Sequence, residues 1–332
     1  MPCLLNSRSE PDTFMPDRVA AFIMNWNGRK WLELCLPSIV NQDYPNLKII
    51  VIDCNSQDGS ADWVEANYSK VHVHRILYDC APPHANNLCA REYDADWICI
   101  LNNDVVLPLD CISNMVQRGR NSMLDSVINP IQLTWDGKFR SIGCEDPLFG
   151  STLSRIFPWQ GTSPFYPCTA CCLVRRDTLF RFPLNEDLFI YEDIEWGWRI
   201  FAAGGQMIAC DQTFFYHYMG GTFQGLSRKQ AYTTGRNIIS TIWICAPNIL
   251  LLLLVPVIFL YYITVGIWCI MKDSYPFEFY RGFLSYFKFL CFQVQSCIIC
   301  MDLDVPTLLP DRSFNNILLC VLWYFLYFKE LL

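Results

Sequence analysis

Apolar and polar residues alternate in blocks along the N-terminal third of the chain, and these blocks predict strands that alternate with helices. The apolar runs are short and nearly continuous, as expected for strands covered on both faces; they lie at Val19–Met24, Leu47–Asp53 and Trp97–Leu101, with a partly alternating run at Val71–Leu77. The stretches between them favour helices over Arg29–Asn41, Ser56–Asn67 and Ala85–Tyr93. This order predicts an α/β fold with a mainly parallel sheet and right-handed crossovers.

The pattern changes after Asp104, where strand-like runs no longer alternate regularly with helices. An Asp136-Gly137 pair between two short apolar runs is typical of a hairpin. The elements predicted for this part are a hairpin over Val127–Gly143, a strand over Cys168–Val174, a helix over Asp193–Ala203 and a short strand over Gln206–Cys210.

The last third of the chain is strongly apolar. Ile249–Met271 holds 23 residues without a charge, which is long enough for a bilayer core that needs about 20. Phe283–Met301 and Phe314–Phe328 are weaker stretches. Three interpretations remain open: a buried helical appendage, helices that lie in the membrane interface, and a true span by the first stretch. We expect a leader (1–18), an α/β domain (19–243) and an apolar, helical, membrane-associated region (244–332).

Composition narrows the classes of function. The chain has 25 Lys and Arg against 32 Asp and Glu, a net charge of −7, so it lacks the positive field that nucleic-acid binding requires. Its 18 cysteines have irregular spacings, and residues 1–18 are polar and broken by prolines, so we expect reduced, mostly buried thiols in a cytosolic domain. The sequence has no Walker-type phosphate loop, dinucleotide fingerprint or serine nucleophile elbow, which argues against ATPase, dehydrogenase and hydrolase activities.

Polar clusters follow three of the predicted strands, at Asn25–Gly28, Asp53–Asp58 and Asn102–Asp104. Ligands of parallel α/β sheets bind beyond the carboxyl ends of the strands, so the three clusters predict one binding edge. An acid that ends a strand can accept hydrogen bonds from a ribose or a base, and the last cluster suits an oxygen-preferring divalent cation. The alternatives are helix capping in the second cluster and a simple Asn-rich turn in the third.

Two further groups carry chemistry. Glu192, Asp193 and Glu195 enter the start of a predicted helix, where crowding raises the pKa of one carboxyl toward the range of a general base. The alternative is that the acids only complement the helix dipole. His217 is the second candidate, with a hydrogen-bonded structural histidine as its alternative.

Taken together and in order, these segments resemble glycosyltransferase family 2, and within it the rhamnosyltransferase-like branch. The matching stretches are Asn25–Gly28, Ile52–Ser60, Leu101–Val105, Tyr191–Glu195, His217 and Gly235–Asn237. The likeness runs from about Val19 to Trp243. It implies a nucleotide-diphosphosugar-binding fold of the GT-A type, followed by apolar C-terminal helices, and inverting transfer of a sugar.

The resemblance also implies roles for single residues. The donor would be held by Asn25, Asp53, Ser56, Asp58, Asn102 and Arg236. A Mg²⁺ or Mn²⁺ ion would be bound by Asp104, with His217 as a further contact. Asp193 would be the general base, with Glu192 beside it, and Thr169 and Ala170, in the strand before, would belong to the acceptor side.

Two departures from the family pattern bear on the donor site. The segment Cys80–Asn87 has two prolines where the family usually has a Gly-Phe-Ala-type loop, and Asn102 stands where many relatives place an acid. We therefore expect a membrane-associated, metal-dependent glycosyltransferase with a cytosolic catalytic domain, acting on a nucleotide-diphosphosugar and a glycan or lipid-linked acceptor. The alternatives are a non-catalytic sugar-nucleotide-binding or scaffolding protein of the same fold, and an integral membrane protein whose soluble part binds a partner.

Overall fold

The computed structural model describes most of the expected α/β domain. The described residues are 16–137, 140–142, 166–218, 228–245, 260, 263–264 and 277–285.

The N-terminal part is a regular alternation of parallel strands and helices. Its elements in chain order are β1 (Val19–Asn25), α1 (Arg29–Val40), β2 (Leu47–Cys54), α2 (Ser60–Asn67), β3 (Val71–Ile76), α3 (Pro82–Glu92) and β4 (Trp97–Asn102). The register sets Asn25 of β1 beside Asp53 of β2, so both strands end at the same edge of the sheet. The predicted elements of this part are confirmed.

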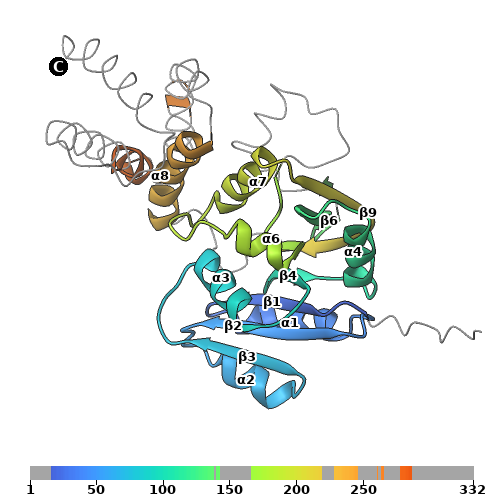
Figure 1. Ribbon diagram of the computed structural model, residues 1–332. Helices are drawn as coiled ribbons and strands as arrows, with labels where there is room; N and C mark the ends of the chain where they lie inside the picture. Colours follow the sequence, from blue (N-terminus) through green and yellow to red (C-terminus); the bar gives the residue numbers. More distant parts are fainter. Residues whose placement is uncertain are drawn as a thin grey trace, which may run out of the picture.

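The second part of the sheet is mixed. Its elements are β5 (Val105–Val106), α4 (Cys111–Arg120), β6 (Ser126–Thr134), β7 (Arg140–Ile142), β8 (Cys171–Arg175), α6 (Arg176–Arg181), α7 (Glu192–Ala202), β9 (Gln206–His217) and α8 (Arg228–Cys245). The strand β8 runs antiparallel to β4 and β6, whereas β9 runs parallel to β6 and antiparallel to β5. Within the described residues the sheet has the order β3-β2-β1-β4-β8-β6-β9-β5, with β7 beside β6. Figure 1 labels β3, β2, β1, β4, β6 and β9 of this sheet.

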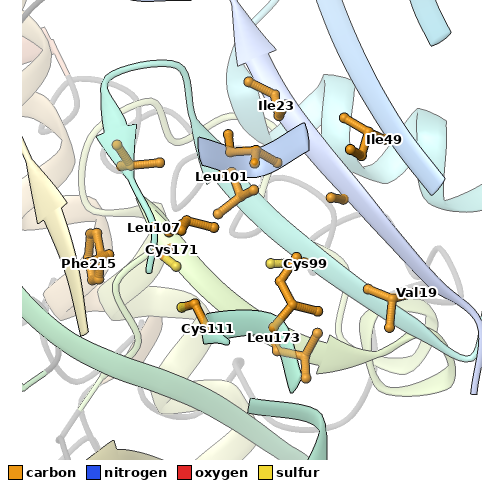
Figure 2. Close-up of a cluster of buried hydrophobic side chains, with 14 of the residues drawn as sticks. Val19, Ile23, Ile49, Cys99, Leu101, Leu107, Cys111, Cys171, Leu173 and Phe215 are labelled. Carbon is orange, nitrogen blue, oxygen red and sulfur yellow. The ribbon is translucent and has the colours of Figure 1, made fainter. Parts of the chain in front are cut away.

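The sheet is the middle layer of three. Successive side chains of a strand point to opposite faces of the sheet. On one face, residues such as Ile23 and Leu101 pack with α1, α2 and α4. On the other face, residues such as Phe22 and Ile100 pack with α3, α6 and α7. Figure 2 shows part of the first cluster, in which the sulfur atoms of Cys99, Cys111 and Cys171 lie among apolar side chains. Ten cysteines whose side chains are described are free, and nine of these ten are buried, as the sequence predicts for this part of the chain.

Several boundaries differ from the sequence prediction; helix α2, for example, begins at Ser60 rather than at Ser56. Helix α3 begins at Pro82 rather than Ala85, because proline has the backbone angle of a first helical turn and needs no hydrogen-bond partner there. Thr169 and Ala170 lie in a turn before β8 instead of in the strand, since the side-chain amide of Asn129 donates to the carbonyls of Cys168 and Cys171 and holds the turn.

The strand β9 continues to His217, well beyond the predicted end at Cys210. The polar residues 211–213 interrupt the apolar pattern, and in the structure they form an irregularity opposite Pro130 and Ile131, after which pairing resumes.

Helix α8 packs closely against a short helical segment at 277–285. A Cβ added to Gly235 would lie 2.0 Å from the carbonyl oxygen of Phe279, and one added to Gly282 would lie 1.9 Å from that of Tyr232. The three predicted apolar stretches fall almost wholly outside the described residues. Among the residues that the structure does describe, no helix has the length and apolar character needed to cross a bilayer.

Candidate active site

A buried network of amide, carboxylate and hydroxyl groups lies where β1 and β2 end. The side-chain amide of Asn25 donates to Oδ1 of Asp53 and to Oγ of Ser60, both at 2.8 Å, and reaches Oγ of Ser56 at 3.2 Å. The other carboxylate oxygen of Asp53 accepts the backbone N–H of Ser56 at 3.2 Å. The structure therefore joins three predicted donor-binding residues, Asn25, Asp53 and Ser56, in one hydrogen-bonded group.

The third polar cluster joins this network through Asn103. Its side-chain amide donates to Oδ1 of Asn25 at 3.0 Å. Gly28 makes room for the contact, because a Cβ on Gly28 would lie 1.9 Å from Nδ2 of Asn103 and 2.5 Å from Oδ1 of Asn25. The ends of β1, β2 and β4 thus share one edge, as the sequence predicts.

Asp58 holds the first turns of two helices. Its carboxylate accepts the backbone N–H of Arg29 at 2.8 Å and that of Ser60 at 3.1 Å. Burial opposes ionisation, but hydrogen bonds from Ser60 and Arg29 outweigh it and lower the pKa of Asp58. These contacts agree with the capping alternative for this residue.

Asp104 and His217 lie together although 113 positions separate them. Oδ1 of Asp104 is 3.2 Å from Nε2 of His217, and both side chains are largely buried. The short pairing of β5 with the end of β9 sets Val105 opposite His217, and the backbone N–H of Tyr218 donates to the carbonyl of Asp104. Burial opposes the charged imidazole, but the hydrogen bond and charge of Asp104 outweigh it and raise the pKa of His217.

A chain of polar contacts leads from His217 toward the acidic helix start. The side-chain amide of Gln132 lies 3.3 Å from Nδ1 of His217, and its oxygen accepts the thiol of Cys168, also at 3.3 Å. The next residue, Thr169, donates its hydroxyl to Oε1 of Glu192 at 3.4 Å. These contacts join β9, β6, the turn before β8 and the start of α7 into a second group.

The carboxyl of Glu192 is held in an environment that disfavours its charge. The residue as a whole is half-buried, but its Oε2 is buried without a hydrogen-bond partner. Burial, followed by the neighbouring charge of Asp193, raises the pKa of Glu192 to about 8. Burial and the charge of Asp193 thus favour the protonated form of this carboxyl.

The backbone before Glu192 is strained, and a side chain of helix α8 holds it in this conformation. Ile190 and Tyr191 have φ angles of 72° and 74°, in the left-handed region that such side chains rarely adopt. The fully buried Asn237 of α8 donates its amide to the carbonyls of Phe189 at 2.6 Å and Ile190 at 2.8 Å. Helix α8 thereby fixes the conformation that presents Glu192 and Asp193.

The remaining predicted residues divide between the two groups and their surroundings. The backbone N–H of Asn102 donates to the carbonyl of Ala170 at 3.0 Å, which sets the turn with Thr169 and Ala170 against the end of β4. Arg236, predicted to bind the donor, donates to the carbonyl of Asp187 at 2.7 Å and to Oδ1 of Asn237. Its described contacts therefore tie α8 to the segment before α7.

The donor set of Asp104 and His217 fits a divalent cation. Two ligands about 2.1 Å from one ion and at right angles stand about 3 Å apart, close to the 3.2 Å between these two side chains. The described residues contain no group of three or more metal-ligating side chains. Mg²⁺ and similar ions, however, are commonly held by one or two protein ligands plus substrate phosphates.

The residues of these groups that are absent from the sequence prediction include Ser60, Asn103, Asn237 and Gln132. Asn103 and Asn237 stand inside the motifs named above, directly beside predicted residues, so their motifs are the signal that could have found them. Gln132 had no such signal, because its importance comes from the pairing of β6 with β9, which sets His217 nearby.

Part of the chain matches a known family model. Residues 21–180 match the family model described as glycosyl transferase family 2. None of the curated proteins matches the chain by sequence. The matched segment contains the network around Asn25, the Asp104 position and the turn with Thr169.

Solved structures give the fold. A mannosyltransferase from Pyrobaculum calidifontis, in complex with GDP-Man and Mn²⁺, is similar at a TM-score of 0.52 and 17% identity, covering 70% of this chain and 65% of that one. TarS residues 1–349 from S. aureus, with UDP-GlcNAc, give a TM-score of 0.48 and 15% identity, covering 69% and 68%. The likeness to the mannosyltransferase gives this chain an α/β fold of the GT-A type, and the chain spans slightly less than two thirds of that protein.

Proposed function

We propose that this protein is an inverting glycosyltransferase, which moves a sugar from a nucleotide-diphosphosugar to a hydroxyl of a glycan or lipid-linked acceptor. The observation that carries the proposal is the joining of two polar groups at one edge of the sheet. Asn103 binds the network of Asn25 and Asp53, and its neighbour Asp104 contacts His217, from which polar side chains lead to Glu192. Such a transfer needs a nucleotide site, a diphosphate site and a base within reach of one another.

The donor is assigned to the first group and to Asp104. Asn25, Asp53 and Ser56 would hold the base and ribose of the nucleotide, and Asp104 and His217 would hold a Mg²⁺ or Mn²⁺ ion. When bound, the ion would neutralise the leaving diphosphate. The Mn²⁺ and GDP-Man named for the mannosyltransferase of the same fold support this assignment.

The acceptor is assigned to the second group. The resemblance to the family assigns the removal of the proton from the acceptor hydroxyl to Asp193. Glu192, Thr169 and Ala170 would form the wall beside it. A base that activates the acceptor on the face opposite the leaving diphosphate gives inversion at the anomeric carbon.

The resemblance to the rhamnosyltransferase-like branch selects rhamnose, on a thymidine-diphosphate donor, as the first sugar to test. The apolar stretch Ile249–Met271 supports a membrane-associated protein, with its catalytic domain in the cytosol. A lipid-linked acceptor is consistent with that location.

The test is thermal stabilisation of the full chain by a panel of nucleotide-diphosphosugars, each with and without Mn²⁺. We expect one donor to raise the Tm only when Mn²⁺ is present. Asp104→Ala should remove the metal-dependent part of the shift, and Asp110→Ala, an exposed acid of the same domain, should keep it. Unchanged stabilisation of the Asp104 variant by donor and Mn²⁺ would contradict the assignment of the metal.

A further inference from the structure

Two thiols outside the two polar groups lie in unusually close contact. Sγ of Cys54, the last residue of β2, is 2.9 Å from Sγ of Cys80, which lies two residues before α3. Cys54 is 1% exposed and Cys80 is half-buried, so one member of the pair can be reached by a small reagent.

The geometry is already close to that of a covalent bond. The sulfur atoms of a disulfide are about 2.05 Å apart, so closing this pair requires an approach of only about 0.9 Å. Cys80 belongs to a connecting segment, which can shift more easily than the sheet strand that carries Cys54.

The two sulfurs are also chemically different. The hydrogen bond with Cys54 lowers the pKa of Cys80 despite its burial and the nearby acids Asp79 and Asp53. The same hydrogen bond, together with burial, raises the pKa of Cys54. Because the thiolate is the nucleophile in thiol–disulfide exchange, the more accessible Cys80 is the member that reacts first.

We propose that Cys54 and Cys80 form a modification site that reacts with low-molecular-weight disulfides and closes into a reversible intramolecular disulfide. The Cys80 thiolate attacks one sulfur of the small disulfide, forms a mixed disulfide and releases one small thiolate. Cys54 then gives up its proton to solvent and attacks Sγ of Cys80, which releases the second small thiolate. The protein loses two electrons and two thiol protons, and the small disulfide is reduced to two thiols.

The disulfide would lie beside the residues proposed to bind the donor at the end of β2. Cys54 directly follows Asp53, and the side-chain amide of Asn55 donates to Asp79 at 3.2 Å beside the sulfur pair. Oxidation therefore ties the segment before α3 to the end of β2. The proposal does not depend on glycosyl transfer, because it concerns only the chemistry of the two thiols.

The test treats the full chain with oxidised glutathione, quenches with acid and maps the tryptic peptides without reduction. Cys54 lies in peptide 49–70, whereas Cys80 shares peptide 76–91 with Cys89. Cys89→Ser removes that ambiguity and should still give the cross-linked pair of peptides. We also expect oxidation to raise the Tm by at least about 4 °C, and dithiothreitol to reverse both effects.

Cys54→Ser and Cys80→Ser should each abolish the cross-link and the rise in Tm. Three results would overturn the proposal: free thiols at both positions after treatment, a glutathione adduct on Cys80 that never resolves, or a cross-link in which either cysteine pairs elsewhere. All three are read from peptide masses, so they are distinguishable from a failure of the protein to bind a nucleotide sugar.

Discussion

The two polar groups at the edge of the sheet are built in different ways. The group around Asn25 and Asp53 is assembled by the register of neighbouring parallel strands, and its buried amide and carboxylate oxygens accept hydrogen bonds within the network. The group from Asp104 to Glu192 joins segments far apart in the chain and contains an unpartnered carboxyl oxygen beside strained backbone.

This difference suggests that the first group binds the donor and that the second group carries out the transfer. A buried network whose polar groups all have hydrogen-bond partners is rigid and preorganised, which suits a nucleotide-binding site. Strained backbone and carboxyl groups with raised pKa values are typical of active sites. Both are unfavourable by themselves and persist because the surrounding structure holds them in place. Substitutions in the second group should therefore separate transfer, stability and donor binding from one another.

The largest effect is expected for Asp193→Asn. General-base assistance contributes about 10²–10⁴-fold, so we expect kcat to fall by that factor while donor affinity stays within a few-fold. Transfer rates and donor-induced thermal shifts measure the two quantities separately. If transfer persists at the wild-type rate, the base lies elsewhere and Glu192 is the next residue to test.

Glu192→Gln should stabilise the protein. A carboxyl with an ordinary pKa of 4.5 and a folded pKa of about 8 binds more protons in the folded state, so the free energy of unfolding falls as pH rises between these values. Glutamine removes that loss and can still accept the hydroxyl of Thr169. We expect the variant to be more stable than wild type at pH 8 by roughly 1–4 kcal/mol, with the difference shrinking toward pH 4.5. Urea unfolding at several pH values measures it, and a constant difference across the range would show that titration of Glu192 is not its cause.

Asn237→Ala tests how the strained backbone is held. The substitution leaves two carbonyl groups without their side-chain donor, at a cost of about 1–3 kcal/mol, and frees Ile190 and Tyr191 to relax. We expect transfer to fall along with stability. Asn67→Ala is the matched control, since that exposed amide donates to a carbonyl of its own helix and its loss should cost under about 0.5 kcal/mol. Equal effects of the two variants would contradict the role of α8.

Much of the first group could be predicted from the sequence. Asn25, Asp53 and the Asn102–Asp104 cluster each follow an apolar run, and parallel strands place their carboxyl ends at one edge. Asp58 could not be assigned in this way, because a carboxylate that caps two helices and one that binds a ribose leave the same sequence signal.

The second group depends on pairings that local patterns do not encode. Polar residues 211–213 interrupt the apolar pattern, so the second half of β9 could not be predicted as a strand. This second half places His217 near Gln132. The turn with Thr169 depends on Asn129, which is remote in sequence, and the strain at Ile190 and Tyr191 depends on α8. The acids of α7 were recognisable as a cluster, but the raised pKa of Glu192 depends on its burial and on the neighbouring charge of Asp193 in the folded chain.

The most direct measurement is transfer itself. The full chain, Mn²⁺, a panel of nucleotide-diphosphosugars and a lipid extract as acceptor source would be assayed for nucleoside diphosphate release and for a sugar-labelled product, with Asp193→Asn in parallel. We expect one donor to give product with the wild-type protein and at least about 100-fold less product with the variant. Binding of a donor by folded protein, without product from any donor, would contradict the account and favour a non-catalytic sugar-nucleotide-binding protein of the same fold.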